Sequence, residues 1–173
     1  GWTLHDASKN IWKANIGSLY SRQLYVNGER AIRARSKDNF NLYETKTGYF
    51  STCTNFSDWE NVKDMEIVSN HKWKHYRIPV ESACNNFINI NSTTWEFIHR
   101  SGWDPNPLTN YNVWESAKVI WIENNYKLID NENEWYIDRA NDCIYYKPFN
   151  GNNPNNLNIV LPKLEKLIVS NKP

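Results

Sequence analysis

Short runs in which apolar and polar residues alternate recur along the chain, and this spacing predicts β-strands more often than helices. The clearest case is residues 23–35, where Asn27-Gly28 separates two strand-like runs. Asn-Gly between such runs is the strongest short-range signal for a β-hairpin. Pairing outward from the turn predicts two cross-strand pairs, Val26 with Glu29 and Tyr25 with Arg30.

The alternation continues beyond this hairpin and assigns faces to the following residues. We expect Ile32 and Ala34 to face inward, because successive side chains of a strand point to opposite faces. Arg33 and Arg35 are then expected to face outward. The outward arginines have two explanations: a solvated strand face, or contact with an anion or a substrate.

Further strands are predicted along most of the chain. Their ranges are 11–16, 65–68, 76–80 and 86–90, with short strands joined by turns across 39–59 and a turn at 69–72. A second hairpin is predicted over residues 134–147, with its turn at 139–142. Pro79 favours an edge or bulge position, because proline has no N–H to donate to a neighbouring strand.

Three segments depart from this pattern. Residues 101–112 contain two prolines, a glycine and several turn-forming residues, and they predict a long ordered loop. Residues 115–128 permit one short helix, although residues 118–122 could equally form a strand. Residues 157–169 have apolar positions close to period two and predict a strand that needs a sheet partner.

Composition supports the same fold class. The chain holds nine Trp and ten Tyr against a single Met, within a hydrophilic sequence of mean hydropathy −0.76. Aromatic residues favour pleated sheets, whereas helix bundles are richer in Leu, Met, Ala and Glu. About a sixth of the residues are Asn, which forms turns and tolerates positive φ. We therefore expect an all-β fold, an antiparallel β-sandwich or barrel with at most one short helix.

Charge and chain pattern make several classes of function improbable. A formal net charge of +1 offers no basic surface for nucleic acid. The longest apolar runs are far shorter than the roughly 20 residues of a membrane span. The sequence also lacks a GxSxG motif, a phosphate-binding Gly-rich loop and a Cys/His nucleophile arrangement. We expect no nucleic acid, membrane or cofactor as a partner.

Cysteine and histidine spacing gives no metal motif. Cys53, Cys84 and Cys143 are widely spaced and lack a CxxC pattern, so buried free thiols are expected, with one disulfide plus a spare cysteine as the alternative. His71 and His75, four residues apart, would come close enough to share a metal only on a helix, where a strand is predicted. The acidic group Asp130, Glu132 and Glu134 is expected to be a solvated turn, because its spacing does not match a calcium loop.

A set of short motifs gives the sequence a family resemblance. They are Gly1-Trp2, Ile11-Trp12-Lys13-Ala14, the runs 22–28 and 30–35, Trp121-Ile122-Glu123-Asn124, and the runs 134–139 and 144–148. In this combination the chain resembles an accessory domain of large bacterial secreted proteins, which carry a right-handed parallel β-helix and are related to glycoside hydrolases. In those proteins a β-helix rung ends in Gly-Trp and leads into an inserted β-sandwich or barrel.

The resemblance implies a division of the chain. Residues 1–156 would form the inserted domain, and residues 157–173 would be the strand that returns to a parallel β-helix, which this sequence does not contain. Both ends would then lead into the helix. The acid and base carboxylates of related glycosidases are expected on the β-helix, outside this chain. The location implied is extracellular or at the cell surface.

Carbohydrate recognition needs flat aromatic faces against sugar C–H surfaces and polar groups for the hydroxyls. Such residues are densest from His99 to Glu115. The candidate carbohydrate-binding residues are Arg100, Trp103, Asp104, Tyr111, Trp114 and Glu115. The alternative is that these aromatics pin the loop to the sheet.

Three functions follow as hypotheses. The first is a non-catalytic accessory domain that binds an oligo- or polysaccharide or shapes the cleft of an adjoining β-helix enzyme. The second is a structural module that caps or spaces the β-helix. The third is a small self-contained glycosidase, for which Glu96 with Asp104, or Glu115 with Glu123, could supply the two carboxylates.

Overall fold

The structure is a computed structural model that describes residues 1–71, 74–99 and 118–164. It confirms the expected all-β class: strands dominate, and the described residues contain one α-helix. The chain divides into two compact units. Unit 1 comprises Gly1–Ala34 with Ile129–Pro173, and unit 2 comprises Arg35–Leu128.

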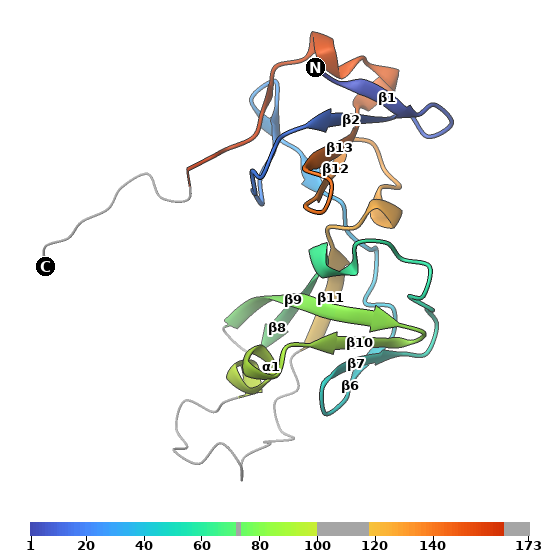
Figure 1. Cartoon of the computed structure of the whole chain (residues 1–173), viewed down its shortest axis with the longest axis vertical. Coiled ribbons are helices and arrows are strands. Elements are labelled where there is room, and N and C mark those ends of the chain that lie inside the picture. The colour runs from blue at the N-terminus through green and yellow to red at the C-terminus, as the bar shows by residue number, and fades with distance from the viewer. Residues whose placement is uncertain (72–73, 100–117, 165–173) are drawn as a thin grey trace, which may run out of the picture. The chain divides into compact units, whose positions relative to one another are not determined.

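Unit 1 contains two sheets (Figure 1). The larger has the order β1 (Thr3–Asp6), β2 (Ile11–Asn15), β13 (Cys143–Lys147), β12 (Glu134–Asp138), β5 (Ile32–Arg33). Its pairs are antiparallel except β5 with β12, which is parallel. The smaller has the order β14 (Ile159–Val160), β3 (Tyr25–Val26), β4 (Glu29–Arg30). Two 3₁₀ turns, Phe149–Gly151 and Pro154–Asn156, precede β14.

Both hairpins predicted in this unit are confirmed. Strands β3 and β4 pair Tyr25 with Arg30 and Val26 with Glu29. The turn residues Asn27 and Gly28 have φ of 52° and 85°, the positive values that a two-residue type I′ turn requires. Strands β12 and β13 pair over their whole length, with the turn between Asp138 and Cys143 as expected.

The core of unit 1 lies between its two sheets. Trp135 and Tyr146 are fully buried and face each other across β12 and β13. The wider cluster adds Leu24, Ala31, Ile137 and Ile144, with partly buried Leu157, Ile159 and Leu161 packed against it. Burial raises the pKa of the Tyr146 phenol to about 12. The start of the predicted strand 157–169 therefore joins this chain's own sheet, although only Ile159–Val160 is a strand among its described residues.

One face assignment is wrong. Ile32 is 40% exposed and Arg33 only 7%, the reverse of the expectation. The cause is a change of sheet: Ala31 donates its N–H to the carbonyl of Leu24, and the chain then leaves the hairpin to pair with β12. Ala34 is buried and Arg35 exposed, as predicted.

Unit 2 is built on a six-stranded antiparallel sheet (Figure 1). Its order is β11 (Lys118–Glu123), β8 (Glu66–His71), β9 (Lys74–Cys84), β10 (Phe87–Ile90), β7 (Gly48–Ser51), β6 (Leu42–Glu44). Short 3₁₀ turns lie at Val62–Asp64 and Tyr126–Leu128. Residues 118–122 therefore form the strand rather than the helix of the two alternatives. The turn expected at 69–72 is wrong, because β8 continues through His71.

The helix, α1 (Ser92–His99), follows β10, where none was predicted. Asn91 caps it, since its side-chain oxygen accepts from the backbone N–H groups of Thr93 and Thr94. Trp95 packs against Tyr49 of β7 in an edge-to-face contact, with ring centroids 5.1 Å apart. One face of the sheet is thus covered by the helix, and burial raises the pKa of Tyr49 far above its ordinary value.

The prediction for asparagine is confirmed, whereas the prediction for the cysteines is confirmed only in part. Among the described non-Gly residues with positive φ, eight of ten are Asn, which confirms its expected role in turns. All three cysteines are free, as predicted, but only Cys143 is buried. Cys53 and Cys84 are exposed, so the expectation of burial is wrong for these two.

Candidate functional site

The six residues predicted to bind carbohydrate lie outside the described residues. These are Arg100, Trp103, Asp104, Tyr111, Trp114 and Glu115. The loop assignment therefore stays a prediction, and so do the carboxylate pairs that include Asp104 or Glu115. His99, at the start of the predicted region, is described and ends α1.

An open pocket of about 470 Å³ lies in unit 2, at the end of β10 where α1 begins. Its walls come from the turn between β6 and β7, from β9, from β10 and from the first turns of α1. The lining residues are mostly polar: Lys46, Thr47, Glu81, Ser82, Asn89, Ile90, Asn91, Ser92, Trp95 and Glu96.

A β-bulge in β9 determines which residues of this strand line the pocket. Asn89 pairs with Ser82, but the next residue, Ile90, pairs with Val80, so Glu81 is the extra residue. The bulge lets Val80 face the buried side with Ile90 while Ser82 stays exposed. Glu81 is thereby placed at the pocket wall. Pro79 lies two residues before the bulge residue and pairs regularly with Glu66 of β8, so it is not itself at the bulge.

Gly48 of β7 allows this strand to lie close to Ile88 of β10. It has φ of +153°, and a Cβ at this position would lie 2.1 Å from the carbonyl oxygen of Ile88. Only glycine tolerates such a close approach of β7 to β10. The preceding residue, Thr47, is thus brought beside Asn89, and its carbonyl accepts from the backbone N–H of Ile90 at 2.9 Å.

Three polar side chains of the pocket lining are linked by hydrogen bonds. The Thr47 hydroxyl donates to Asn89 Oδ1 at 3.2 Å, and Asn89 Nδ2 donates to the Ser82 hydroxyl at 3.3 Å. Both bonds are long, and each group keeps further donor or acceptor capacity. With Lys46, Glu81 and Glu96 exposed around them, these groups suit a ligand rich in hydroxyls.

Helix α1 forms the remaining wall and is fixed at both ends. Trp95 is only 3% exposed, and its Nε1 has no hydrogen-bond partner among the described residues. At the other end, His99 Nε2 lies 3.6 Å from a carboxylate oxygen of Glu44, and Nδ1 lies 2.7 Å from the carbonyl of Trp95. Burial of the ring lowers the pKa of His99, but the bonds to Glu44 and Trp95 outweigh it, so the net pKa is raised.

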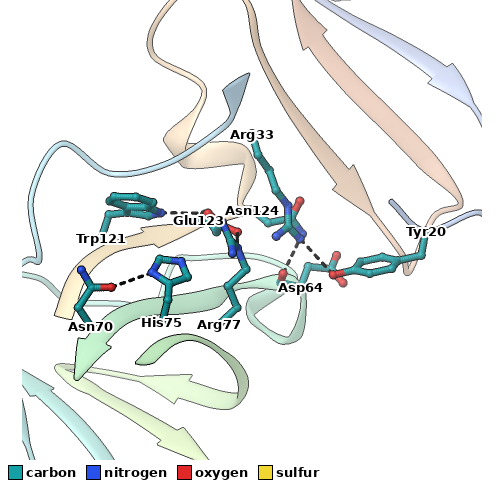
Figure 2. A network of polar contacts seen from close by, with 9 residues as sticks. All are labelled: Tyr20, Arg33, Asp64, Asn70, His75, Arg77, Trp121, Glu123 and Asn124. Atoms are coloured by element: carbon teal, nitrogen blue, oxygen red, sulfur yellow. Dashed lines mark hydrogen bonds and ion pairs between the residues drawn. The ribbon is translucent and has the colours of Figure 1, made fainter. Parts of the chain in front are cut away.

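A second polar cluster lies on β8, β9 and β11 (Figure 2). Glu123 is 4% exposed and accepts from Arg77 Nε and from Trp121 Nε1, both at 2.9 Å. The Arg35 guanidinium lies 4.6 Å from the centre of the Trp121 ring, and His75 Nδ1 lies 2.7 Å from the side-chain oxygen of Asn70. The main polar atoms are already used within the cluster, so we assign it a structural role.

No group of metal-ligating side chains is found in the described part of the chain. Asp130 and Glu132 lie in an exposed turn as expected, but the expectation is wrong for Glu134, which begins β12 and is buried. Glu134 accepts from the backbone N–H groups of Asp130 and Asn131, each at 2.9 Å. Burial raises the pKa of Glu134. Within the described residues, no helix has the length and apolar character needed to cross a membrane.

Comparison with known proteins gives one fold relationship. No family model matches the sequence, and no curated protein matches it. A solved structure described as "Glycoside hydrolase" matches with a TM-score of 0.69 and 23% sequence identity over 96% of this chain. The chain spans 31% of the length of that protein. The fold of this chain is therefore similar to part of a larger glycoside hydrolase.

Proposed function

We propose that this chain is a non-catalytic accessory module of a carbohydrate-active protein and that its pocket binds a glycan. The observation that carries the proposal is the pocket itself, whose lining is mostly polar and in which Thr47, Asn89 and Ser82 are linked by hydrogen bonds. Amide, hydroxyl and carboxylate groups are the side chains that bind sugar hydroxyls. Such a module would act outside the cell or at its surface.

Two observations support a place within a larger protein. The structural neighbour is a glycoside hydrolase about three times as long as this chain, which spans 31% of it. In addition, Trp2 and Asn155 exchange hydrogen bonds of 2.8 and 2.9 Å. A domain inserted in another protein needs its two connections close together. We propose that the parent carries a parallel β-helix, reached through Gly1-Trp2 and again beyond β14, since β14 itself pairs with β3 of this chain.

The exposure of the pocket carboxylates favours binding over hydrolysis. Glu81 and Glu96 line the same pocket, and both are exposed. A glycosidase keeps one carboxyl protonated near neutral pH by burying it or by placing it beside another acid. Exposed carboxylates can accept hydrogen bonds from the hydroxyl groups of a sugar.

Calorimetric titration of the chain against a panel of neutral and acidic oligosaccharides tests this function. We expect saturable binding to at least one series, weakened in Glu96→Gln. Glu29→Gln, an exposed change in unit 1, is the matched control and should bind like the wild type. If the wild-type chain binds none of the panel, the binding function is wrong and a capping or spacing role replaces it. Release of sugar from the panel by the chain alone would instead identify it as a glycosidase.

A further inference from the structure

A row of aromatic side chains crosses three neighbouring strands of unit 2. The register pairs Tyr43 of β6 with Phe50 of β7, and Phe50 with Phe87 of β10. Directly paired residues of an antiparallel sheet project from the same face. The three rings therefore form one continuous strip, which we call the aromatic row.

The aromatic row is open to solvent. Tyr43 is 60% exposed and Phe87 is 49% exposed. Phe50 lies between them, partly buried, with its ring centroid 5.0 Å from that of Phe87. Single exposed hydrophobic residues are common on protein surfaces, but a contiguous aromatic strip is typical of a surface that binds something.

Two polar residues of the pocket, Asn89 and Ser82, lie on the face of the sheet that carries the aromatic row, whereas Ile90 and Trp95 line the pocket from the other face. Phe87 and Asn89 are two residues apart on β10, and residues so spaced point to the same side. The same holds for Phe50 and Gly48 on β7. Asn89 lies about 7 Å along β10 from Phe87, and the row itself spans about 10 Å across the strands. Trp95 covers Tyr49, which lies on the other face.

The two features complement each other in the way that an oligosaccharide requires. Sugar rings present apolar C–H faces, which stack on aromatic rings, and hydroxyl edges, which form hydrogen bonds. The aromatic row offers the first surface, and Asn89 with Ser82 offers the second. The charged groups around the pocket are two carboxylates, Glu81 and Glu96, against one ammonium, Lys46. This balance disfavours a chain of uronic acids.

We propose that the aromatic row continues the pocket as a second subsite, so that unit 2 binds a neutral oligosaccharide chain of several sugar rings. One sugar occupies the pocket, and the following rings lie over Phe87, Phe50 and Tyr43. This inference rests on the proposed function and adds to it the class of ligand and the direction in which the ligand extends.

The dependence of affinity on chain length tests the proposal. Neutral oligosaccharides from monosaccharide to hexasaccharide are titrated into the wild-type chain, Tyr43→Ala and Phe87→Ala, alongside an oligogalacturonide of the same length. In the wild type we expect affinity to rise with chain length and the oligogalacturonide to bind weakly. Each variant should lose about tenfold of the hexasaccharide affinity while keeping the affinity for the monosaccharide.

Phe149→Ala is the matched control, because Phe149 is 50% exposed but lies in unit 1. If hexasaccharide binds and both variants bind it within about twofold of the wild type, the aromatic row is not a subsite, and the proposed function stands. If no neutral sugar binds the wild type, the proposal of a neutral oligosaccharide fails; if no acidic sugar binds either, the proposed function fails with it. Sedimentation of each protein adds one readout: a wild-type dimer that Phe87→Ala dissociates would assign the row to self-association and overturn the proposal.

Discussion

The two units contain the same arrangement of aromatic residues in opposite surroundings. In unit 1, Trp12, Tyr146 and Trp135 face one another across β2, β13 and β12, and the last two are fully buried. In unit 2, Tyr43, Phe50 and Phe87 face one another across β6, β7 and β10, and the outer two are exposed. Register is alike in the two rows, and burial is what differs.

The difference separates a packing role from the binding role that we propose for the exposed row. The unit 1 row is covered by the three-stranded sheet and contributes the stability that comes with removing large rings from water. The unit 2 row is not covered by α1, because this helix lies on the other face of the sheet, where Trp95 packs on Tyr49. Aromatic residues there give little stability to the folded chain and remain available to a ligand.

The largest expected effect is therefore on the stability of unit 1. Trp135→Ala removes a ring that is 0% exposed, and such a change costs about 4 kcal/mol in the free energy of unfolding. Phe87→Ala, at the equivalent place in the exposed row, should cost less than about 1 kcal/mol. Urea unfolding followed by tryptophan fluorescence compares the two. Similar losses in both variants would mean that the rows do not differ as described.

A smaller loss is expected from Gly48→Ala, which acts on unit 2. The new Cβ would meet the carbonyl oxygen of Ile88 at 2.1 Å, so β7 must move away from β10 at a cost of about 3 kcal/mol. Gly17→Ala is the control: Gly17 has φ of +60° with nothing within 4 Å, and about 1 kcal/mol is expected. Equal costs measured by urea unfolding would contradict the close approach of these strands.

The smallest effect concerns the contact that fixes the end of α1. The net pKa of His99 is raised in the folded chain, above an unfolded value of about 6.5. The stability from this contact is therefore complete below that value and is lost as pH rises through the higher folded pKa. We expect His99→Gln to destabilise unit 2 by less than about 1 kcal/mol at pH near 5, and by less still near pH 8.

Thermal unfolding of wild type and His99→Gln at the two pH values measures this difference. Glu44→Gln removes the other partner, 3.6 Å away, and should flatten the pH dependence in the same way. A gap between wild type and His99→Gln that widens as pH rises would show that the ring is held neutral, against the assignment made here.

Local signals made much of the fold predictable. The hairpins at Asn27-Gly28 and between Asp138 and Cys143 follow from turn chemistry and alternation, which depend on a few adjacent residues. The abundance of Asn likewise predicted turns with positive φ, and such turns are found. Such features need no knowledge of distant parts of the chain, and the structure bears them out.

Features set by distant strands were not predictable. Arg33 is buried because the chain changes sheets after Ala31, which depends on the position of β12. The pocket depends on the bulge at Glu81, and the aromatic row on pairing between β6, β7 and β10. Each of the three aromatics is unremarkable by itself in the sequence. Phe87 and Asn89 are two residues apart in the predicted strand 86–90. Their placement on one face, with an aromatic and a polar side chain, could therefore be read from the sequence.

Chemical-shift mapping tests the central claim most directly. The ¹⁵N-labelled chain is titrated with the neutral hexasaccharide that binds most tightly. The account predicts that the largest amide shifts occur at Tyr43, Phe50, Phe87 and Asn89, with none in the buried row around Trp135. Shifts confined to unit 1 or to residues 100–117, with β7 and β10 unaffected, would contradict it.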